Sequence, residues 1–423
     1  MAASSAARVG DRETRLEIPE AVREIAQRLE DHGHETWAVG GAVRDALSGE
    51  NRSDWDLATQ ARPETVRKLF RPSYPIGIRF GTVGVRGRDG RVYEVTTFRR
   101  DIETDGRHAV VEYADRLDED LSRRDFTINA IAYHPLRGVV HDPFSGMQDL
   151  ERRVLRCVGE PEMRFAEDYL RVLRGLRFAG RYGLEIEPQT WEALRAAVGR
   201  LTRLSGERVR EEIIKVLMAE RPSSSLSLYR DSGALAVIMP ELADGGWAES
   251  LRTIDAIDQR RLLLRLSVLL SAAGPATEEM MRRLRFSNAE IRDVVALGGA
   301  VETPLPEAGD VVGGRRWLRK VQPQWALDAL RLHFAAARAR PWPGARRARL
   351  AGQARLLLGI LRRGDPVTLA DLAIDGEDLK ALGLRPGPDF GRILEGCLDV
   401  VIEAPESNQR ELLLEHVRGR ISE

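Results

Sequence analysis

Apolar residues recur along the chain at two spacings, and the spacing changes near residue 155. The segment 18–32 repeats apolar side chains every three to four positions, which is typical of an amphipathic helix. Short apolar or alternating runs, which predict strands, follow at 36–39, 54–58, 82–86 and 92–98. The last two runs flank an Asp-Gly pair, which favours a tight hairpin turn. The first third of the chain is therefore expected to form a mixed sheet with helices.

Beyond residue 155 the strand signals stop, and helical periodicity takes over. Apolar positions at helical spacing occur at 165–182, 189–199, 206–218 and 260–272. We therefore expect an α+β fold in which a mixed-sheet head precedes an all-α body. Residues 1–15 are small and polar without periodicity, and they predict a loose leader.

The composition is that of a globular protein in a reducing compartment. Of the 423 residues, 43% are hydrophobic and 31% are charged, which excludes a disordered or collagen-like chain. Cys157 and Cys397 lie far apart without a His or Cys at metal-ligand spacing, so neither a disulfide framework nor a zinc knuckle is expected. The N-terminal segment lacks the apolar stretch of a signal peptide, and the longest apolar run, 262–270, is too short to span a bilayer. These features predict a cytoplasmic protein without a membrane segment.

Charge is distributed unevenly, although the chain has 65 basic and 65 acidic residues. Residues 315–363 contain 13 Lys or Arg and a single acid, whereas residues 365–423 contain 13 acids and six bases. The basic block also holds four large aromatic residues, Trp317, Trp325, Phe334 and Trp342. Such a stretch suits a polyanion whose phosphates it neutralises and whose bases pack on aromatic rings. A solvated face shared by several helices also explains the pattern.

Two glycines and two aspartates are the sharpest candidates for chemistry. Gly40 and Gly41 lie between a predicted strand and a predicted helix, where bare backbone N–H groups let phosphate oxygens approach closely. Arg44 follows one helical turn later. Asp54 and Asp56, two apart on a predicted strand, point to one face, and their repulsion favours bound divalent cations. Asp-x-Asp alone is common at turns. Together with the upstream Gly-Gly it predicts a two-metal Mg²⁺ site, which would polarise an attacking hydroxyl and the leaving pyrophosphate.

The order of these motifs resembles the DNA polymerase β nucleotidyltransferase superfamily, and more specifically its class II tRNA nucleotidyltransferases. The first motif of that family is similar to VGGAVRDALSG and SDWDLAT, both within 39–59. Three further motifs follow in order, LSRRDFTINA at 121–130, EDYLR at 167–171 and LSGER at 204–208. The resemblance implies a polymerase β-like mixed-sheet head followed by an elongated all-α neck, body and tail.

The resemblance also sets the expected domain boundaries. After the loose leader at 1–15, we expect a nucleotidyltransferase head at 16–155, a helical neck with a nucleotide-base template at 156–220, and a helical body and tail that bind tRNA at 221–423. The oligomeric state is not predicted.

The EDYLR segment also has a chemical interpretation of its own. Asp168 and Arg171 lie three apart on a predicted helix, where they offer an acceptor beside a fork of donors. A carboxylate accepts from the exocyclic amino group of cytosine or adenine, whereas uracil and guanine have a carbonyl there. The pair is thus expected to select CTP and ATP without a nucleic-acid template. Arg174 and Arg177 turn further around the helix and are assigned to the sugar and triphosphate. A helix carrying surface ion pairs is the alternative.

By the same resemblance, the protein is expected to add CCA to the 3′ end of tRNA from CTP and ATP. The terminal 3′-hydroxyl of the RNA attacks the α-phosphate, and pyrophosphate leaves. The resemblance implies Mg²⁺ on Asp54 and Asp56, phosphates against Gly41, Arg44 and Arg124, and tRNA on the helical body with its basic block 315–363.

Other functions fit parts of the sequence. A bacterial poly(A) polymerase shares the head, but it typically has an arginine-rich stretch where this chain reads IGIRFGTV at 76–83. An enzyme that adds only A has nearly the same motifs. The polar segment 99–118, with Asp105–His108 at its centre, resembles the flexible loop of enzymes that add the terminal A, which argues against a CC-only enzyme. A non-catalytic RNA-binding protein is disfavoured by the intact carboxylates. The role of Glu94, on the second hairpin strand, stays open.

Overall fold

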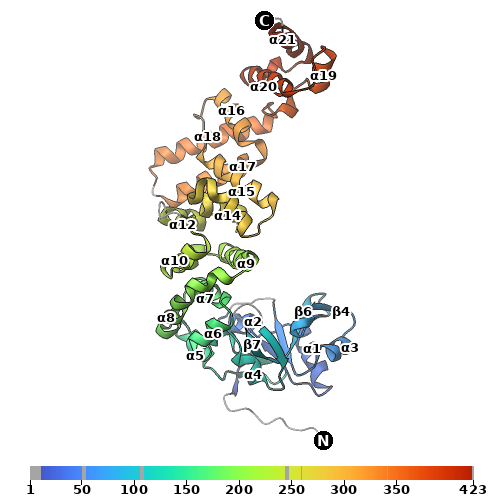
Figure 1. Ribbon diagram of the computed structural model, residues 1–423, viewed down its shortest axis with the longest axis vertical. Helices are drawn as coiled ribbons and strands as arrows, with labels where there is room; N and C mark the ends of the chain where they lie inside the picture. The colour runs from blue at the N-terminus through green and yellow to red at the C-terminus, as the bar shows by residue number, and fades with distance from the viewer. Residues whose placement is uncertain are drawn as a thin grey trace. The chain divides into compact units, whose positions relative to one another are not determined.

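The computed structural model describes residues 11–49, 54–104, 109–242, 247–258, 260–340 and 342–421. The chain divides into two compact units, residues 1–240 and 241–423. Figure 1 draws the first unit from blue to yellow-green and the second from there to red. The first unit contains a mixed sheet with helices, and every element described in the second unit is helical. The expected α+β fold, with a sheet-containing head ahead of a helical body, is confirmed.

An eight-stranded mixed sheet forms the centre of the first unit. In spatial order its strands are β1 (Asp11–Glu13), β10 (Val139–His141), β9 (Ala132–His134), β2 (Thr36–Val39), β3 (Asp56–Thr59), β6 (Val92–Thr97), β5 (Thr82–Arg86) and β4 (Ser73–Gly77). The pair β3 and β6 is parallel, and the other neighbours in this sheet are antiparallel. The antiparallel pairing of β5 and β6 confirms the predicted hairpin.

Helices occupy the rest of both units. Those of the first unit are α1 (Glu20–Glu30), α2 (Gly41–Leu47), α3 (Pro63–Leu69), α4 (Leu117–Ser122), α5 (Gly146–Glu151), α6 (Pro161–Glu167), α7 (Leu170–Tyr182), α8 (Pro188–Ala197), α9 (Gly206–Leu217), α10 (Pro222–Asp231) and α11 (Ala234–Ile238). Those of the second are α12 (Trp247–Asp255), α13 (Leu262–Leu270), α14 (Thr277–Arg283), α15 (Asn288–Glu302), α16 (Val311–Val321), α17 (Pro323–Ala339), α18 (Gly344–Arg363), α19 (Gly376–Ala381), α20 (Pro388–Glu403) and α21 (Arg410–Ile421). Short 3₁₀ helices lie at Ile78–Phe80 (η1), Thr127–Asn129 (η2), Val198–Arg203 (η3), Ser271–Ala276 (η4), Leu369–Asp371 (η5) and Pro405–Ser407 (η6).

The two faces of the sheet are covered differently. On one face, α1, α2 and α3 pack against alternate strand residues such as Leu57 and Val95. On the other face, Leu121 of α4 joins a core with Ala58 and Ala132, which covers β2, β3 and β9. Over β6, β5 and β4 this second face is open, because Val92 and its neighbours are exposed in the described part of the chain. The sheet therefore has one half-covered face, and the candidate site lies at the edge of that cover.

Part of the predicted leader is an ordered strand. Residues 11–13 form β1, which pairs with β10 so that Asp11 lies opposite His141. The expectation of a loose leader over 1–15 was wrong for these three residues, because backbone hydrogen bonds hold an edge strand without requiring apolar side chains. Residues 1–10 lie outside the described part of the chain.

The polar segment expected to be a loop contains two strands. β7 (Arg99–Thr104) and β8 (Ala109–Tyr113) pair antiparallel, and Arg100 Nη2 forms an ion pair with Glu112 Oε2 at 2.5 Å. The expected loop thus contains an antiparallel strand pair, which this cross-strand ion pair supports. The centre of the predicted loop, residues 105–108, lies outside the described residues.

Strands also continue slightly beyond the predicted limit. β11 (Val154–Leu155) pairs in parallel with β12 (Glu185–Ile186), so the strand content does not end at residue 155. Two-residue strands give too little alternation to be recognised from sequence.

Helices α16, α17 and α18 share one core within the second unit. It contains Trp317, Leu330 and Leu357, with Trp325 and Phe334 packed partly buried against it. A separate core joins α19, α20 and α21 through Leu379 and Val401. None of the helices described has both the length and the apolar character needed to cross a membrane.

Candidate active site

A glycine turn begins the candidate site. β2 ends at Val39, Gly40 has a φ of 79°, and α2 begins at Gly41. A Cβ atom at Gly40 would lie 3.3 Å from Arg124 Nη1 and 3.9 Å from Asp56 Oδ2. Glycine is therefore required here for two reasons, the left-handed backbone and the close approach of a cation and a carboxylate. The turn brings bare backbone to the predicted metal ligand, as the sequence suggested.

The two predicted metal ligands lie in different settings. β3 begins at Asp56, so Asp54 precedes the strand and is exposed, and the predicted strand over 54–58 starts two residues late. In the parallel register Leu57 lies opposite Val95, which makes Glu94 the neighbour of Asp56 on the adjacent strand. Asp56 thus begins the strand, whereas Asp54 lies in the segment just before it.

Asp56 is an unusual acid. Burial and, to a lesser extent, the nearby carboxylates of Glu94 and Asp54 raise the pKa of Asp56 to about 7, although the charge of Arg124 opposes them. A carboxylate that is held so unfavourably in its charged form is a good site for a cation, which removes the repulsion. Among the described residues, no group of three or more His, Cys, Asp or Glu could hold a metal ion. Two carboxylates suit a hard divalent cation that takes its remaining oxygen ligands from elsewhere.

Arg124 lies between the carboxylates and the second predicted motif. Its Nη2 pairs with Asp120 Oδ2 at 3.0 Å, and its Nη1 donates to the carbonyl of Asn129 at 3.4 Å. Asp120 is buried and also binds Arg123 at 2.8 Å. Burial favours the neutral acid, but the two arginines lower the pKa of Asp120. The Nε of Arg124 is buried and has no hydrogen-bond partner in the described part of the chain.

Arg44 is held within the wall of the site. Only 4% of it is exposed, and its guanidinium donates to Asp45 Oδ1 (2.7 Å), Asn129 Oδ1 (2.5 Å) and the hydroxyl of Tyr182 (2.5 Å). Its Cζ also lies 4.3 Å from the centre of the Tyr182 ring. These contacts tie α2 to α7, so Arg44 contributes positive charge from a fixed position.

The predicted template helix is interrupted at its key acid. α6 ends at Glu167, Asp168 is extended (φ −154°, ψ 106°), and α7 begins at Leu170. Asp168 Oδ2 accepts from Arg208 Nη2 at 2.7 Å, and Oδ1 accepts from the backbone N–H of Leu170 at 3.0 Å. The expectation that Asp168 and Arg171 share a helix face was wrong, because the ion pair with Arg208 on α9 holds Asp168 in the break between the two helices.

Arg171 and Arg174 project from the first turns of α7. Arg171 Nη1 donates to Glu167 Oε2 (2.5 Å), and its Nη2 donates to the carbonyl of Arg123 (3.0 Å). Arg174 Nη2 pairs with Asp125 Oδ2 at 2.6 Å. Burial alone would raise the pKa of Asp125, but the charge of Arg174 and a hydrogen bond from Asn129 hold it at about 2. The second motif and the template motif are therefore joined by a permanently ionised pair.

Arg177 does not reach the site. It is buried and its Nε donates to Glu212 Oε2 at 2.6 Å, in a pair whose side chains are 6% and 1% exposed. It does not line the cavity that the other predicted residues share. The prediction that Arg177 contacts the nucleotide is not supported by this position, because its partner on α9 draws the side chain into the helix–helix interface.

The Arg177–Glu212 pair gives a prediction for stability. Substituting Arg177→Ala leaves the Glu212 carboxylate buried with Lys215 as its remaining cation, and should lower the free energy of unfolding by about 3 kcal/mol. Denaturant unfolding measures this loss, and the KM for CTP should change less than about twofold. A variant of unchanged stability with a CTP KM raised about tenfold or more would contradict this assignment.

One cavity of about 540 Å³ collects most of the predicted residues. Its lining includes Gly41, Arg44, Asp56, Arg124, Asp168, Arg171 and Arg174. Seven arginines and three aspartates face it, a positive balance that suits a triphosphate. Its volume is typical of a site for a small molecule. Among the predicted residues, Asp54 and Arg177 are absent from the lining.

Several lining residues were missed by the sequence analysis. They are Arg99, Arg123, Asn129, Leu170, Phe178 and Arg208. Arg208 had a signal, since it belongs to the LSGER motif, and Asn129 belongs to LSRRDFTINA. Nothing in the sequence indicated Arg99, because it begins a strand in the segment expected to be a loop.

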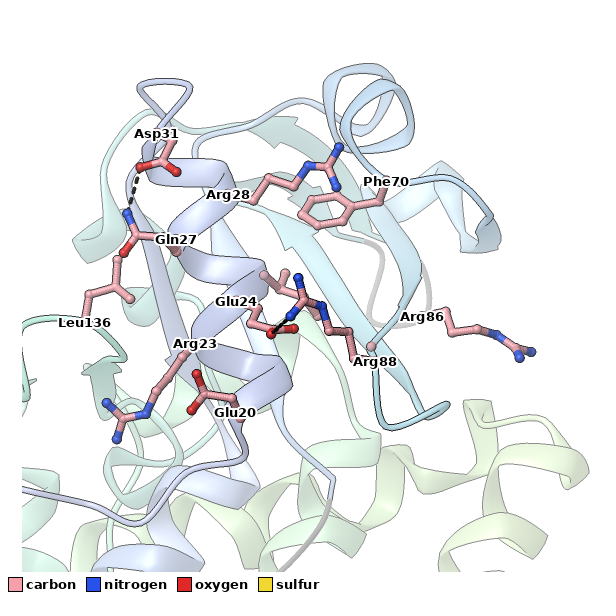
Figure 2. A pocket seen from close by; sticks show the side chains of 12 residues that line it. Glu20, Arg23, Glu24, Gln27, Arg28, Asp31, Phe70, Arg86, Arg88 and Leu136 are labelled. Carbon is pink, nitrogen blue, oxygen red and sulfur yellow. Dashed lines mark hydrogen bonds and ion pairs between the residues drawn. The ribbon is translucent and has the colours of Figure 1, made fainter.

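A second hollow lies along α1, on the face of the sheet opposite Glu94. Figure 2 shows Arg28 over the ring of Phe70, an ion pair between Glu24 and Arg88, and a hydrogen bond from Gln27 to Asp31. This hollow contains none of the predicted site residues.

Comparisons with known proteins agree with this geometry. Three families match successive segments: "Poly A polymerase head domain" at 36–156, "Probable RNA and SrmB- binding site of polymerase A" at 183–245, and "tRNA nucleotidyltransferase domain 2 putative" at 258–417. The chain is 33% identical over 395 residues to the CCA-adding enzyme of Geobacillus stearothermophilus, covering 92% of this chain and 93% of that one. The chain belongs to the CCA-adding enzyme family, which are tRNA nucleotidyltransferases.

Other members of the CCA-adding enzyme family support the assignment along the whole chain. The CCA-adding enzyme of Lactiplantibacillus plantarum is 34% identical over 416 residues, covering 94% of this chain and 96% of its own. The crystal structure of the Bacillus stearothermophilus CCA-adding enzyme in complex with CTP has a TM-score of 0.79 at 30% identity, covering 95% and 98% of the two chains. The Thermotoga maritima CCA-adding enzyme complexed with tRNA has a TM-score of 0.63 at 20% identity and shows the same fold. CCA-adding nucleotidyltransferases generally use a divalent metal, which the two aspartates fit.

Proposed function

We propose that this protein adds C, C and A in turn to the 3′ end of tRNA, with CTP and ATP as donors and pyrophosphate as the leaving group. One observation carries the proposal. A single basic cavity has the glycine turn and Asp56 at one end and Asp168, Arg171 and Arg174 at the other. The first end suits nucleotidyl transfer and the second suits recognition of a base. The CTP and tRNA complexes of related CCA-adding enzymes support the same choice of substrates.

The residues at the reacting end would act through charge and position. Asp54 and Asp56 would hold Mg²⁺, which when bound supplies a Lewis acid for the 3′-hydroxyl and the leaving phosphates. The backbone of Gly41 leaves room for the triphosphate, and Arg124, with its unpartnered Nε, would move towards the phosphates. Arg44 would add charge from behind without leaving its internal partners.

The residues at the other end would choose the base. One oxygen of Asp168 would accept from the exocyclic amino group of cytosine or adenine, and Arg171 would donate to ring acceptors beside it. Arg208 would fix the carboxylate in one orientation, and Arg174 would face the sugar and phosphates. A base with a carbonyl in place of the amino group would put its own oxygen lone pairs against those of Asp168. The missing hydrogen bond costs about 1–3 kcal/mol.

The helical parts would hold the RNA. We propose that residues 16–155 form the transferase head, 156–220 the neck with the base-selecting residues, and 221–423 the body and tail that bind tRNA. Unpaired bases are not expected to stack on Trp317, Trp325 or Phe334, because these rings pack into the core of α16–α18.

The basic block is also narrower than its sequence suggests. Arg315 pairs with Asp365 at 2.8 Å and Arg319 with Asp399 at 2.5 Å, so part of the block neutralises the acidic tail. Five basic residues of the block form no ion pair within the part of the chain that the structure describes, namely Lys320, Arg346, Arg347, Arg355 and Arg362. We propose these five residues as the RNA-facing part of the block. The two cysteines are free and buried, which supports a reducing, cytoplasmic location.

Product sizing on three primers tests the proposed function. Purified protein with Mg²⁺ is incubated with tRNA that ends before CCA, after C or after CC, each with CTP, ATP or both. We expect the shortest primer to gain three nucleotides and then to stop. If only the CC-ended primer gains A, the protein is an A-adding specialist. Long A-tails would make it a poly(A) polymerase, and no addition to any primer would leave an RNA-binding protein.

A further inference from the structure

The open half of the sheet carries an unusual number of exposed apolar side chains. Ile76 at the end of β4 is 51% exposed, Phe80 in η1 is 52% exposed, and Val92 at the start of β6 is 42% exposed. Ile78 and Tyr113 beside them are also exposed. Isolated exposed apolar residues need no explanation, but a contiguous group marks a surface that something covers.

Two of these residues, Ile76 and Val92, lie on the face that carries Glu94 and Asp56. A Cβ atom built on Gly84 would collide with Ile76 Cδ1 and lie 2.9 Å from Val92 Cγ1, so both side chains meet above this glycine. Gly84 is paired directly with Glu94, whose side chain therefore projects on the same face. Glu94 in turn is close enough to Asp56 to raise its pKa. The apolar surface is thus continuous with the carboxylates along β6 and β5.

Phe80 connects the same surface to the nucleotide cavity. Arg99 Nη1 donates to the carbonyl of Phe80 at 2.5 Å, and Arg99 Cζ lies 5.9 Å from the centre of the Phe80 ring. Arg99 also lines the cavity with Gly40, Asp56 and Arg124. Through Arg99, Phe80 therefore borders the cavity.

We propose that Ile76, Phe80 and Val92, with Arg99 at their edge, form a platform for the unpaired 3′-terminal nucleotides of the RNA primer. This inference rests on the proposed function. The nucleotide fills the cavity, so the attacking 3′-hydroxyl must reach the carboxylates from another side, and the open sheet face leads directly to them. Bases stack well on aromatic and apolar surfaces, and an adjacent arginine attracts the phosphates between them.

The chemistry of the platform favours unpaired RNA over the other occupants of an apolar face. A second copy of this chain would bury Ile76 and Val92 equally well, but it would also block the carboxylates that transfer requires. Any base can stack on the flat ring of Phe80, because stacking does not depend on the hydrogen-bonding groups of the base. The platform therefore accepts each added nucleotide alike as the RNA grows, whereas base choice stays with Asp168 and Arg171.

Binding of two RNA hairpins tests the platform without relying on turnover. One hairpin ends in three unpaired 3′ nucleotides and the other is blunt, and fluorescence anisotropy measures both affinities. Wild-type protein should prefer the overhang by about tenfold, and Phe80→Ala should lose that preference. Phe80→Tyr keeps the ring and should restore it. Met218→Ala removes another exposed apolar side chain, at the C-terminal end of α9 and outside the cavity lining, so it is the matched control and should behave as wild type.

Kinetics provide the second readout. Phe80→Ala should raise the KM for primer about tenfold and change the KM for CTP less than about twofold, with an unchanged melting temperature because the ring is half exposed. An unchanged overhang preference in Phe80→Ala would overturn the platform. The platform would also be overturned if light scattering shows that the wild-type protein is a dimer and that Phe80→Ala makes it a monomer without weakening RNA binding. If wild-type protein binds the overhang but adds no nucleotide, the proposed function fails and the platform stands.

Discussion

Substituting Asp56→Asn is expected to lower the rate of CTP addition by about 1,000-fold or more and, at the same time, to stabilise the metal-free protein. The rate falls because an amide cannot replace a carboxylate as a ligand for Mg²⁺, and the bound metal contributes several kcal/mol to transition-state stabilisation. Single-turnover incorporation of CTP at saturating Mg²⁺ measures the loss.

The same substitution should stabilise the metal-free protein for an electrostatic reason. Burial, with Glu94 and Asp54 nearby, raises the pKa of Asp56 to about 7. The unfolded chain ionises this group near its ordinary pKa, so folding becomes less favourable as pH rises from about 4 to 7, and the full penalty remains above pH 7. In EDTA, Asp56→Asn should therefore raise the melting temperature more at pH 8 than at pH 5.

A matched substitution separates this effect from a general change of charge. Asp31→Asn removes an acid from α1, beside the hollow in Figure 2 and away from the carboxylates. It should leave CTP addition unchanged and give no stability gain. Wild-type rates in Asp56→Asn, or an equal rate loss in Asp31→Asn, would contradict the assignment of Asp56 as a metal ligand.

Substituting Asp168→Asn is expected to change which nucleotides are accepted. The amide can rotate to donate to a carbonyl, so uracil no longer faces an unpaired acceptor, while the charge-assisted bond from cytosine is lost. The ratio of kcat/KM for CTP to that for UTP should fall about 10- to 100-fold, which corresponds to one lost base contact. Steady-state kinetics with each nucleotide on a primer that accepts C measure the ratio.

The control for this prediction lies on α6, the helix that ends just before Asp168. Glu162→Gln changes an exposed acid of α6 that does not line the cavity, and it should leave the CTP to UTP ratio unchanged. Asp168→Asn also weakens the bond to Arg208, so its melting temperature is measured in parallel. An unchanged ratio in a folded Asp168→Asn variant would mean that the base is read elsewhere.

Local patterns in the sequence were sufficient for half of the strands in the head's main sheet, β2, β3, β5 and β6. The Gly40–Gly41 turn, the strand before it and the β5–β6 hairpin are each specified by residues close together in the chain, through positive φ, alternation and Asp-Gly. The position of Asp56 beside this turn follows from the pairing of neighbouring strands. Periodicity also identified the helical body.

The features that the sequence did not reveal depend on partners far along the chain. Asp168 leaves the helix because Arg208, 40 residues later, holds its carboxylate. Arg177 leaves the cavity because Glu212 binds it, and helical spacing cannot show which of several arginines finds such a partner. Trp317 is a further example. Its place in a basic segment suits a contact with RNA bases, but the structure buries its ring in the core of α16–α18.

The measurement that tests the central claim most directly is the sequence of the nucleotides added when all four are available. Transcribed tRNA that ends before CCA is incubated with the protein, Mg²⁺ and equal concentrations of ATP, CTP, GTP and UTP, and the 3′ ends are sequenced. If one cavity both transfers the nucleotide and selects its base, the products end in CCA without U or G. Tails of A alone, unselected nucleotides, or no extension would contradict the account.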